Sequence, residues 1–262
     1  MSPAATGRAA ERPFERVGVV LLRPRSPGNV GSVARAMKNM GFGRLVLASA
    51  ATYDDPGYFD AEARRMAWRA ADLLERRQVA PDLDAALAPF SLVVGTSSRP
   101  GAGARVLTPR EAAALVASRL AAEPSESAAF LFGREDSGLT REDLARCHVI
   151  GSIRSARAYP SLNLSHAVLV FLYEARLALL GDAPEQTRRP APAPLPARGQ
   201  VEAFYGRLER ALEEIGFFRG TARASMMRDL RLLLNRAFLT QRELAIFEGL
   251  VHRILGAARR RG

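Results

Sequence analysis

The sequence predicts an α/β protein with a mostly parallel sheet covered by helices on both faces, followed by a small helical domain. Short apolar runs bounded by Gly, Pro or Ser alternate with longer segments in which apolar residues recur at helical spacing. A proline-rich stretch at 182–198 then separates this alternation from a C-terminal segment that carries helical patterning only.

Five apolar runs are expected to form buried strands, because each is five or six residues long and flanked by residues that break regular structure. They are VGVVLL at 17–22, RLVLAS at 44–49, LVVGT at 92–96, AFLFG at 129–133 and the run at 149–153. Helical patterns occupy 33–40, 58–75, 109–121 and 164–180. Strands that alternate with helices in this way pack as a parallel sheet.

The C-terminal segment is expected to form three helices, at 201–215, 222–237 and 241–258. The second of them carries an arginine face, which is either solvated surface or an RNA contact. We therefore divide the chain into a disordered extension (1–16), an α/β domain (17–181), an extended linker (182–198) and a helical extension (199–262).

Composition narrows the class of protein. The longest uninterrupted apolar run, 167–173, is far shorter than the roughly 20 residues that span a bilayer, and no apolar leader begins the chain. We expect a cytoplasmic protein with no membrane partner. The single cysteine, Cys147, excludes an intramolecular disulfide and leaves a cysteine-based zinc site short of ligands, so no metal is expected.

The net charge of +11 favours a polyanionic partner such as nucleic acid. All but one of the 38 basic residues are Arg, which is equally consistent with codon bias. Charge alone therefore does not decide between RNA, DNA and an anionic membrane surface.

Three blocks place small, amide-bearing or charged residues where strands are expected to give way to helices: NVGSVAR at 29–35, FGREDSGLT at 132–140 and SLNLS at 161–165. Such turns meet at one edge of a parallel sheet, where cofactors bind, so we expect one nucleotide-like site.

Each block also has an ordinary structural explanation. Asn29 suits the N-cap of a helix that begins near Gly31, a residue whose missing side chain would let another backbone or a substrate approach closely. Glu135 could simply hold Arg134. Asn163 or Ser165 could do no more than cap a helix.

Taken in order, the blocks resemble the SpoU (TrmH-like) branch of the SPOUT methyltransferases. The strand end LVVGTSSR and the helix LNLSHAVLVFLYEAR strengthen the resemblance, which runs from about 17 to 180. Within the branch, YPSLNL and the tail sequences FYGRLERALEEIGFFR and RDLRLLLNRAF are most similar to tRNA 2'-O-ribose methyltransferases that act at nucleotide 32 of the anticodon loop.

The resemblance implies a SPOUT-type parallel sheet that ends in a C-terminal trefoil knot, a homodimer, and S-adenosyl-L-methionine bound inside the knot. It implies that Arg35 is the catalytic arginine, with Asn29, Glu135, Ser161 and Asn163 around it. It also implies a set of cofactor-binding residues: Thr96, Ser97, Ser98, Gly133, Ile153, Pro160, Ser161 and Leu162. Arg154 stands where the branch often carries Pro, which could alter the loop over the cofactor. The three histidines, His148, His166 and His252, fall outside the implied catalytic set.

The implied chemistry deprotonates a ribose 2'-hydroxyl as it attacks the methyl carbon of a sulfonium. An arginine, with a pKa above ~12, is a poor general base in water. Either the substrate phosphate and neighbouring groups help Arg35 accept the proton, or Arg35 stays charged and stabilises the developing alkoxide. We favour the second reading.

Two alternatives keep the fold and change the function. The same chemistry could act on rRNA or on another tRNA site, or the protein could be a non-catalytic RNA-binding scaffold. A Rossmann enzyme is disfavoured because no GxGxxG motif follows 17–22. The base at the modified position is not determined, because every nucleotide carries the 2'-hydroxyl.

Overall fold

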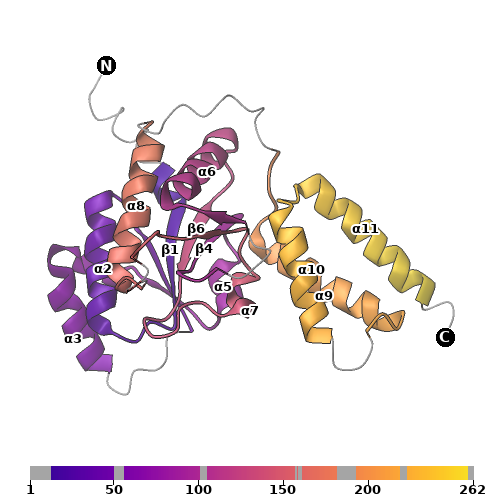
Figure 1. Cartoon of the computed structure of the whole chain (residues 1–262), viewed down its shortest axis with the longest axis horizontal. Coiled ribbons are helices and arrows are strands. Elements are labelled where there is room, and N and C mark those ends of the chain that lie inside the picture. The colour runs from indigo at the N-terminus through magenta and orange to yellow at the C-terminus, as the bar shows by residue number, and fades with distance from the viewer. Residues whose placement is uncertain are drawn as a thin grey trace.

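The computed structural model describes residues 13–49, 56–100, 105–156, 158, 161–181, 193–218 and 223–258. It consists of an α/β part and a helical part packed against one side of it (Figure 1). The predicted fold class is confirmed in both respects.

Within the described residues, seven strands form one parallel sheet in the order β3-β2-β1-β6-β4-β7-β5. They are β1 (Val17–Leu22), β2 (Arg44–Ala48), β3 (Gln78–Ala80), β4 (Leu92–Thr96), β5 (Val106–Leu107), β6 (Ala128–Phe132) and β7 (Val149–Gly151). All five expected strands are present. The two that were not predicted, β3 and β5, are short strands at the sheet's two edges. Every residue of β1 and β6 is buried, as continuous apolar runs require when a sheet is covered on both faces.

Helices cover both faces of the sheet. Alternate residues of β1 serve different cores: Val19 and Leu21 pack beneath one set of helices, Val20 and Leu22 beneath the other. The first set comprises α2 (Pro27–Met40), α3 (Pro56–Ala67), η1 (Trp68–Ala70), α4 (Ala71–Glu75), α6 (Pro109–Ala122) and α8 (Leu164–Leu180). The second comprises α5 (Leu83–Leu87) and α7 (Arg141–Leu144). Figure 1 shows α2, α3 and α8 side by side.

The start of α2 differs from the prediction. Ser26, not Asn29, is the N-cap: its hydroxyl accepts from the Asn29 N–H at 3.3 Å, and Pro27 occupies the first helical position. The helix therefore begins four residues before Gly31. Asn29 lies within the first turn, which leaves its side-chain amide available for contacts outside the helix.

The predicted disorder of 1–16 is wrong for its last four residues. Phe14 is buried and packs edge-on against Phe42, with ring centroids 5.2 Å apart. The Arg16 guanidinium donates to the carbonyl oxygens of Leu120 at 2.7 Å and Glu123 at 3.0 Å. Apolar burial and backbone hydrogen bonds hold this segment on the α/β part; residues 1–12 lie outside the described residues.

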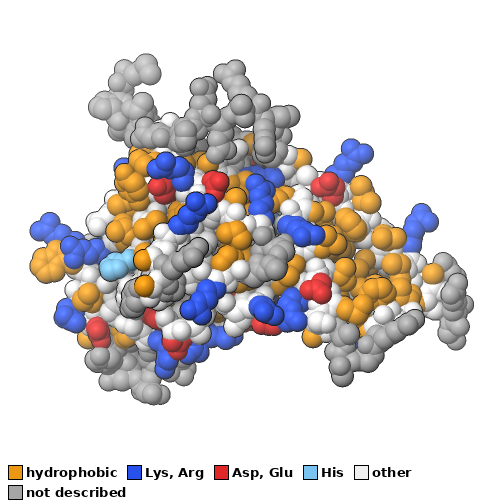
Figure 2. All heavy atoms as spheres, in the orientation of Figure 1, with side chains coloured by type: hydrophobic (Ala, Val, Ile, Leu, Met, Phe, Trp, Pro, Cys, Tyr) orange, Lys and Arg blue, Asp and Glu red, His pale blue; other side chains and the backbone are white. Residues whose placement is uncertain are grey.

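The helical part contains the three expected helices, α9 (Arg198–Glu214), α10 (Arg223–Arg236) and α11 (Gln241–Ala258). Val201, Phe204 and Tyr205 of α9 share a small core with Leu244 and Val251 of α11. Apolar side chains remain exposed on this part (Figure 2). Among them are Leu233 of α10 and Ile246 and Leu250 of α11.

The proposed linker ends in a docked segment. Residues 182–192 lie outside the described residues, but Leu195 is buried and its N–H donates to Glu126 Oε1 at 2.7 Å. Arg198, which we assigned to the linker, is the first residue of α9. Its backbone N–H donates to the Phe90 carbonyl at 2.7 Å, next to the start of β4.

A buried polar cluster joins the two parts. The Arg198 side chain has no exposed surface and donates to Asn235 Oδ1 at 2.8 Å. The Tyr205 hydroxyl donates to the same oxygen at 2.9 Å, and the Asn235 amide donates to the Ala145 carbonyl, just before β7. The helical part thus docks near the amino ends of β4 and β7.

Candidate functional site

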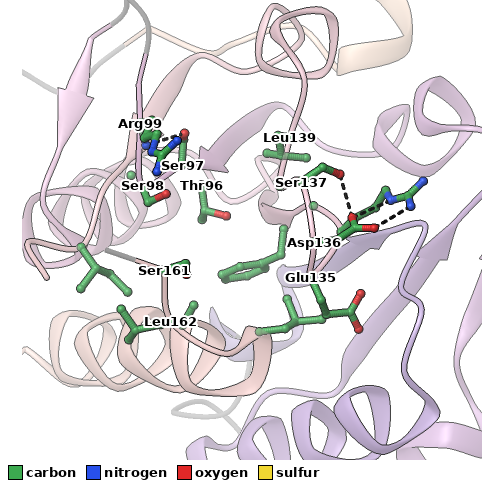
Figure 3. A pocket seen from close by; sticks show the side chains of 18 of the residues that line it. Thr96, Ser97, Ser98, Arg99, Glu135, Asp136, Ser137, Leu139, Ser161 and Leu162 are labelled. Atoms are coloured by element: carbon green, nitrogen blue, oxygen red, sulfur yellow. Dashed lines mark hydrogen bonds and ion pairs between the residues drawn. The ribbon is translucent and has the colours of Figure 1, made fainter. Parts of the chain in front are cut away.

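A cavity of about 600 Å³ opens at the carboxyl ends of β4, β6 and β7, whereas the helical part docks near the amino ends of the strands. This volume is within the range of small-molecule sites. Its lining comes from four segments, Thr96–Arg99, Phe132–Leu139, Gly151 with Ile153, and Ser161–Phe171. Figure 3 shows Thr96, Ser97 and Ser98 on one side, Glu135 and Asp136 on another, and Ser161 and Leu162 beside the start of α8.

The lining is polar on one side and apolar on another. Thr96 donates its hydroxyl hydrogen to the Leu131 carbonyl at 3.0 Å, and Ser97 Oγ accepts from the Arg99 N–H at 3.1 Å. Ile153, Leu162 and Phe171 supply apolar surface. A ligand that combines a flat apolar ring with hydroxyl and amine groups, such as a nucleoside, suits this lining.

Two glycines are required by close packing around the cavity. A Cβ at Gly133 would lie 2.2 Å from the Gly138 carbonyl carbon, and one at Gly151 would lie 2.5 Å from the Phe171 ring. Gly138 itself has φ +69°, a conformation that favours glycine. The absence of side chains lets the loop after β6 fold back tightly over the strand end.

A chain of hydrogen bonds joins the three sequence blocks beside the cavity. Glu135 accepts from the backbone N–H groups of Arg25 at 2.9 Å and Ser26 at 3.1 Å, and from the Asn29 side-chain amide at 3.1 Å. Asn29 Oδ1 in turn accepts from the Asn163 amide at 2.9 Å. Residues more than a hundred positions apart in sequence are therefore held together as one unit.

Asn163 and Glu135 make contacts beyond those that ordinary local structure requires. Asn163 is indeed the N-cap of α8, because its Oδ1 accepts from the Ser165 N–H at 2.9 Å, but it also binds Asn29. Glu135 does not hold Arg134. That role belongs to Asp136, which pairs with Arg134 at 2.9 Å and with Arg25 at 2.6 Å.

Asp136 is held as a carboxylate. Hydrogen bonds from Arg134, Ser137 and Arg25 hold its pKa well below the ordinary value for aspartate. It lines the cavity beside Glu135, whose oxygens are already occupied by three N–H donors.

Seven of the eight expected cofactor-binding residues line the cavity: Thr96, Ser97, Ser98, Gly133, Ile153, Ser161 and Leu162. The eighth, Pro160, lies outside the described residues. Leu139 and Phe171 also line the cavity and are not among the residues that the sequence predicts. The spacing of Leu164, Ala167 and Phe171 on one face of the predicted helix was the available signal.

The expected catalytic residues divide into two groups. Glu135 and Ser161 line the cavity, whereas Asn29, Asn163 and Arg35 do not. Arg35 is exposed on α2, and within the described residues its side chain makes no hydrogen bond or ion pair. Close approach at Gly31 is confirmed: a Cβ there would lie 2.1 Å from the Ala63 carbonyl oxygen of α3.

Two titratable side chains, those of Cys147 and His148, are buried in the protein. Burial raises the pKa of Cys147 to about 12 and lowers the pKa of His148 to about 3, so the thiol stays protonated and the imidazole neutral. His148 Nδ1 accepts from the Val93 N–H at 3.1 Å.

The described residues contain no cluster of three or more His, Cys, Asp or Glu side chains that could hold a metal ion. Among them there is also no helix with the length and apolar character needed to cross a bilayer.

Comparison with known proteins identifies two family matches. Residues 16–173 match the model of the SpoU rRNA Methylase family, and residues 199–262 match that of the tRNA methyltransferase TrmJ, C-terminal domain. The tRNA (cytidine/uridine-2'-O-)-methyltransferase TrmJ of Cronobacter sakazakii is 38% identical over 91% of this chain and 95% of its own length. The protein of the same name from Salmonella typhimurium is 37% identical over 91% and 96%.

Solved structures agree. The crystal structure of TrmJ from Z. mobilis ZM4 superimposes with a TM-score of 0.77 at 27% identity, covering 90% of this chain and 98% of that one. A probable methylase family protein from Haemophilus influenzae Rd KW20 gives 0.58 at 31% identity, covering 95% and 100%.

Proposed function

The chain belongs to the SpoU rRNA methylase family, and from that membership we propose that it is a tRNA 2'-O-ribose methyltransferase that uses S-adenosyl-L-methionine and modifies nucleotide 32 of the anticodon loop. The observation that carries the proposal is the hydrogen-bonded unit of Asn29, Glu135 and Asn163 beside the cavity at the strand ends. The curated relatives named above, which are tRNA cytidine/uridine 2'-O-methyltransferases, support the choice of substrate.

The cavity fits S-adenosyl-L-methionine in chemistry and size. The hydroxyls of Thr96, Ser97 and Ser98 suit its polar groups, and Ile153 and Leu162 suit a flat adenine ring. Gly133, Ser161 and Pro160 complete the proposed set. When bound, this cofactor supplies an electrophilic methyl group on a positively charged sulfur.

We also propose the trefoil knot and the homodimer. The sheet order supports the knot, because β7 lies between the earlier strands β4 and β5. The homodimer is supported by the exposure of Arg35 away from its own cavity, which would let the partner's Arg35 complete that site. Exposed apolar side chains on and before α8, Leu162, Leu169 and Tyr173, offer a surface for such a contact.

In the proposed reaction, the ribose 2'-oxygen would take the methyl group of bound S-adenosyl-L-methionine with cleavage of the carbon–sulfur bond, and the 2'-hydroxyl proton would pass to solvent water. The two carboxylates that line the cavity are poor candidates for the base, because Glu135 is saturated with N–H donors and Asp136 with arginines. The guanidinium of Arg35 would stabilise the developing alkoxide. Proximity of the two reactants contributes the larger part of the rate.

The helical extension, 199–262, would contribute tRNA binding, with 17–181 as the catalytic domain and 182–198 as the linker. Its match to the TrmJ C-terminal domain supports a tRNA over an rRNA substrate. A tRNA substrate would place the protein in the cytoplasm. The alternatives are methylation of rRNA or another tRNA site, and a non-catalytic RNA-binding scaffold.

The testing experiment is transfer of labelled methyl from S-adenosyl-L-methionine to bulk tRNA and, separately, to rRNA, followed by mapping of 2'-O-methyl positions. Label at nucleotide 32 is the expected result. Label elsewhere would keep the enzyme class and replace the substrate, and RNA binding without label would favour the scaffold.

A further inference from the structure

Trp68 is the only tryptophan of the chain, and its side chain contributes little to the packing of the fold. It is the first residue of η1, 69% exposed, with φ +54°. A bulky side chain rarely adopts this left-handed conformation, which costs free energy that burial does not offset here. A strained, exposed aromatic residue is more typical of a binding surface than of a packing role.

The turn that carries Trp68 lies beside Arg35. Met66 packs over α2 at Gly31, where an added Cβ would come within 2.9 Å of the Met66 Cβ. Further along the same helix, the Lys38 ammonium donates to the Arg69 carbonyl at 2.8 Å. Arg35 is four residues after Gly31 and three before Lys38, so all three share the face of α2 that meets residues 66–69.

Around Trp68, the side-chain charges that are not neutralised by an ion pair are positive. Each acidic side chain from 60 to 75 pairs with a base: Asp60 with Arg77, Glu62 with Arg65, Asp72 with Lys38 and Arg76, and Glu75 with Arg64. By contrast, the exposed side chains of Arg35 and Arg69 make no hydrogen bond or ion pair within the part of the chain that the structure describes.

We propose that Arg35, Met66, Trp68 and Arg69 form a surface for unpaired RNA, in which Trp68 stacks on a nucleobase and the arginines contact phosphates. An exposed aromatic ring flanked by cations is the usual composition of single-strand RNA sites. The proposal rests on the proposed function, because the loop nucleotides that flank the target ribose would lie where Arg35 acts. It adds a contact that neither the cavity nor the helical extension supplies.

The solitary tryptophan gives a direct readout. Tryptophan fluorescence of the full-length protein reports Trp68 alone, and stacking on a base should quench it. We expect quenching by an anticodon stem-loop RNA and none by a blunt duplex of the same stem sequence. Equal quenching by both RNAs would overturn the stacking role. So would a signal that changes on dilution of the protein without RNA, because a second copy of the chain would then cover the surface.

The matching variant is Trp68→Gly, because glycine accepts φ +54° without strain and the protein should be at least as stable as the wild type. We expect KM for tRNA to rise about 5- to 150-fold, as loss of one stacked base predicts. The value of kcat at saturating tRNA and the affinity for S-adenosyl-L-methionine should not change. Trp68→Tyr should retain most of the affinity. Val79→Ala, which removes apolar surface at a different exposed position, is the control; Val79 is 64% exposed.

The outcomes separate this proposal from the proposed function. A wild-type protein that methylates tRNA, together with a Trp68→Gly variant of unchanged KM, would overturn the RNA surface and leave the methyltransferase standing. A wild-type protein that fails to methylate, but whose fluorescence is quenched by the stem-loop only, would refute the methyltransferase and support the surface.

Discussion

Replacing Asn235 by alanine should loosen the helical part from the α/β part, and the size of the effect can be worked out from three contacts. The change removes the acceptor shared by Arg198 and Tyr205 and the donor to the Ala145 carbonyl. Each buried group left without a partner costs about 1–3 kcal/mol. Glu202 still pairs with Arg198, and the Arg231 carbonyl lies 3.4 Å from the Tyr205 hydroxyl, so part of the loss is compensated.

We therefore expect a loss of about 3–4 kcal/mol, a large share of the 5–15 kcal/mol typical of a domain. The measurement is urea unfolding followed by circular dichroism, with limited proteolysis to detect release of the helical part. Tyr205→Phe is the companion variant, with an expected cost of about 1 kcal/mol. In the Asn235→Ala background its cost should shrink, because the hydroxyl has already lost that acceptor. A loss below about 1 kcal/mol for Asn235→Ala would refute the view that this cluster holds the two parts together.

Three further predictions concern the site and the core. Arg35→Ala should lower the single-turnover rate of methyl transfer by about 10²–10³-fold and leave cofactor affinity unchanged in calorimetry; transfer at the wild-type rate would count against a catalytic role. Gly151→Ala should cost about 1–3 kcal/mol of stability and weaken cofactor binding, because the new Cβ would lie 2.5 Å from Phe171 in the cavity wall; unchanged affinity would contradict the placement of the cofactor. His148 titrates near pH 3 in the folded state and near its ordinary pKa of 6.5 when unfolded, so the unfolded state binds the extra proton between these values. Stability should fall as pH decreases from about 6.5 toward 3, by about 1.4 kcal/mol per unit, and His148→Gln should flatten that dependence in urea unfolding; an equal slope in the variant would exclude His148 as its cause.

The sequence predicts the central strands well because burial on both faces leaves a continuous apolar run, as in VGVVLL and AAFLF. It also predicts most of the cavity, because strand ends of a parallel sheet converge at one edge. β3 and β5 are missed because runs of three and two residues carry no periodic signal.

Contacts across long sequence separations explain the remaining errors. The sequence predicts disorder at Phe14 because the local pattern carries no signal of its partner Phe42. Local rules predict a helix cap at Asn29, yet its side-chain amide donates to Glu135, 106 positions away. The Arg198–Asn235 contact that docks the helical part has no local signature at all. Local propensity fixes elements better than it fixes the polar contacts between them.

The helical part docks at the amino ends of β4 and β7, whereas the cavity opens at their carboxyl ends. The strands consequently set the distance between the docked helical part and the cavity. A five-residue strand such as β4 spans about 16 Å, and hydrogen-bonded strands neither stretch nor bend easily along their length. Under the proposed function, this fixed span would determine how far the cofactor lies from an RNA held by the helical extension. The choice of nucleotide would then depend on strand length as well as on the residues that touch it.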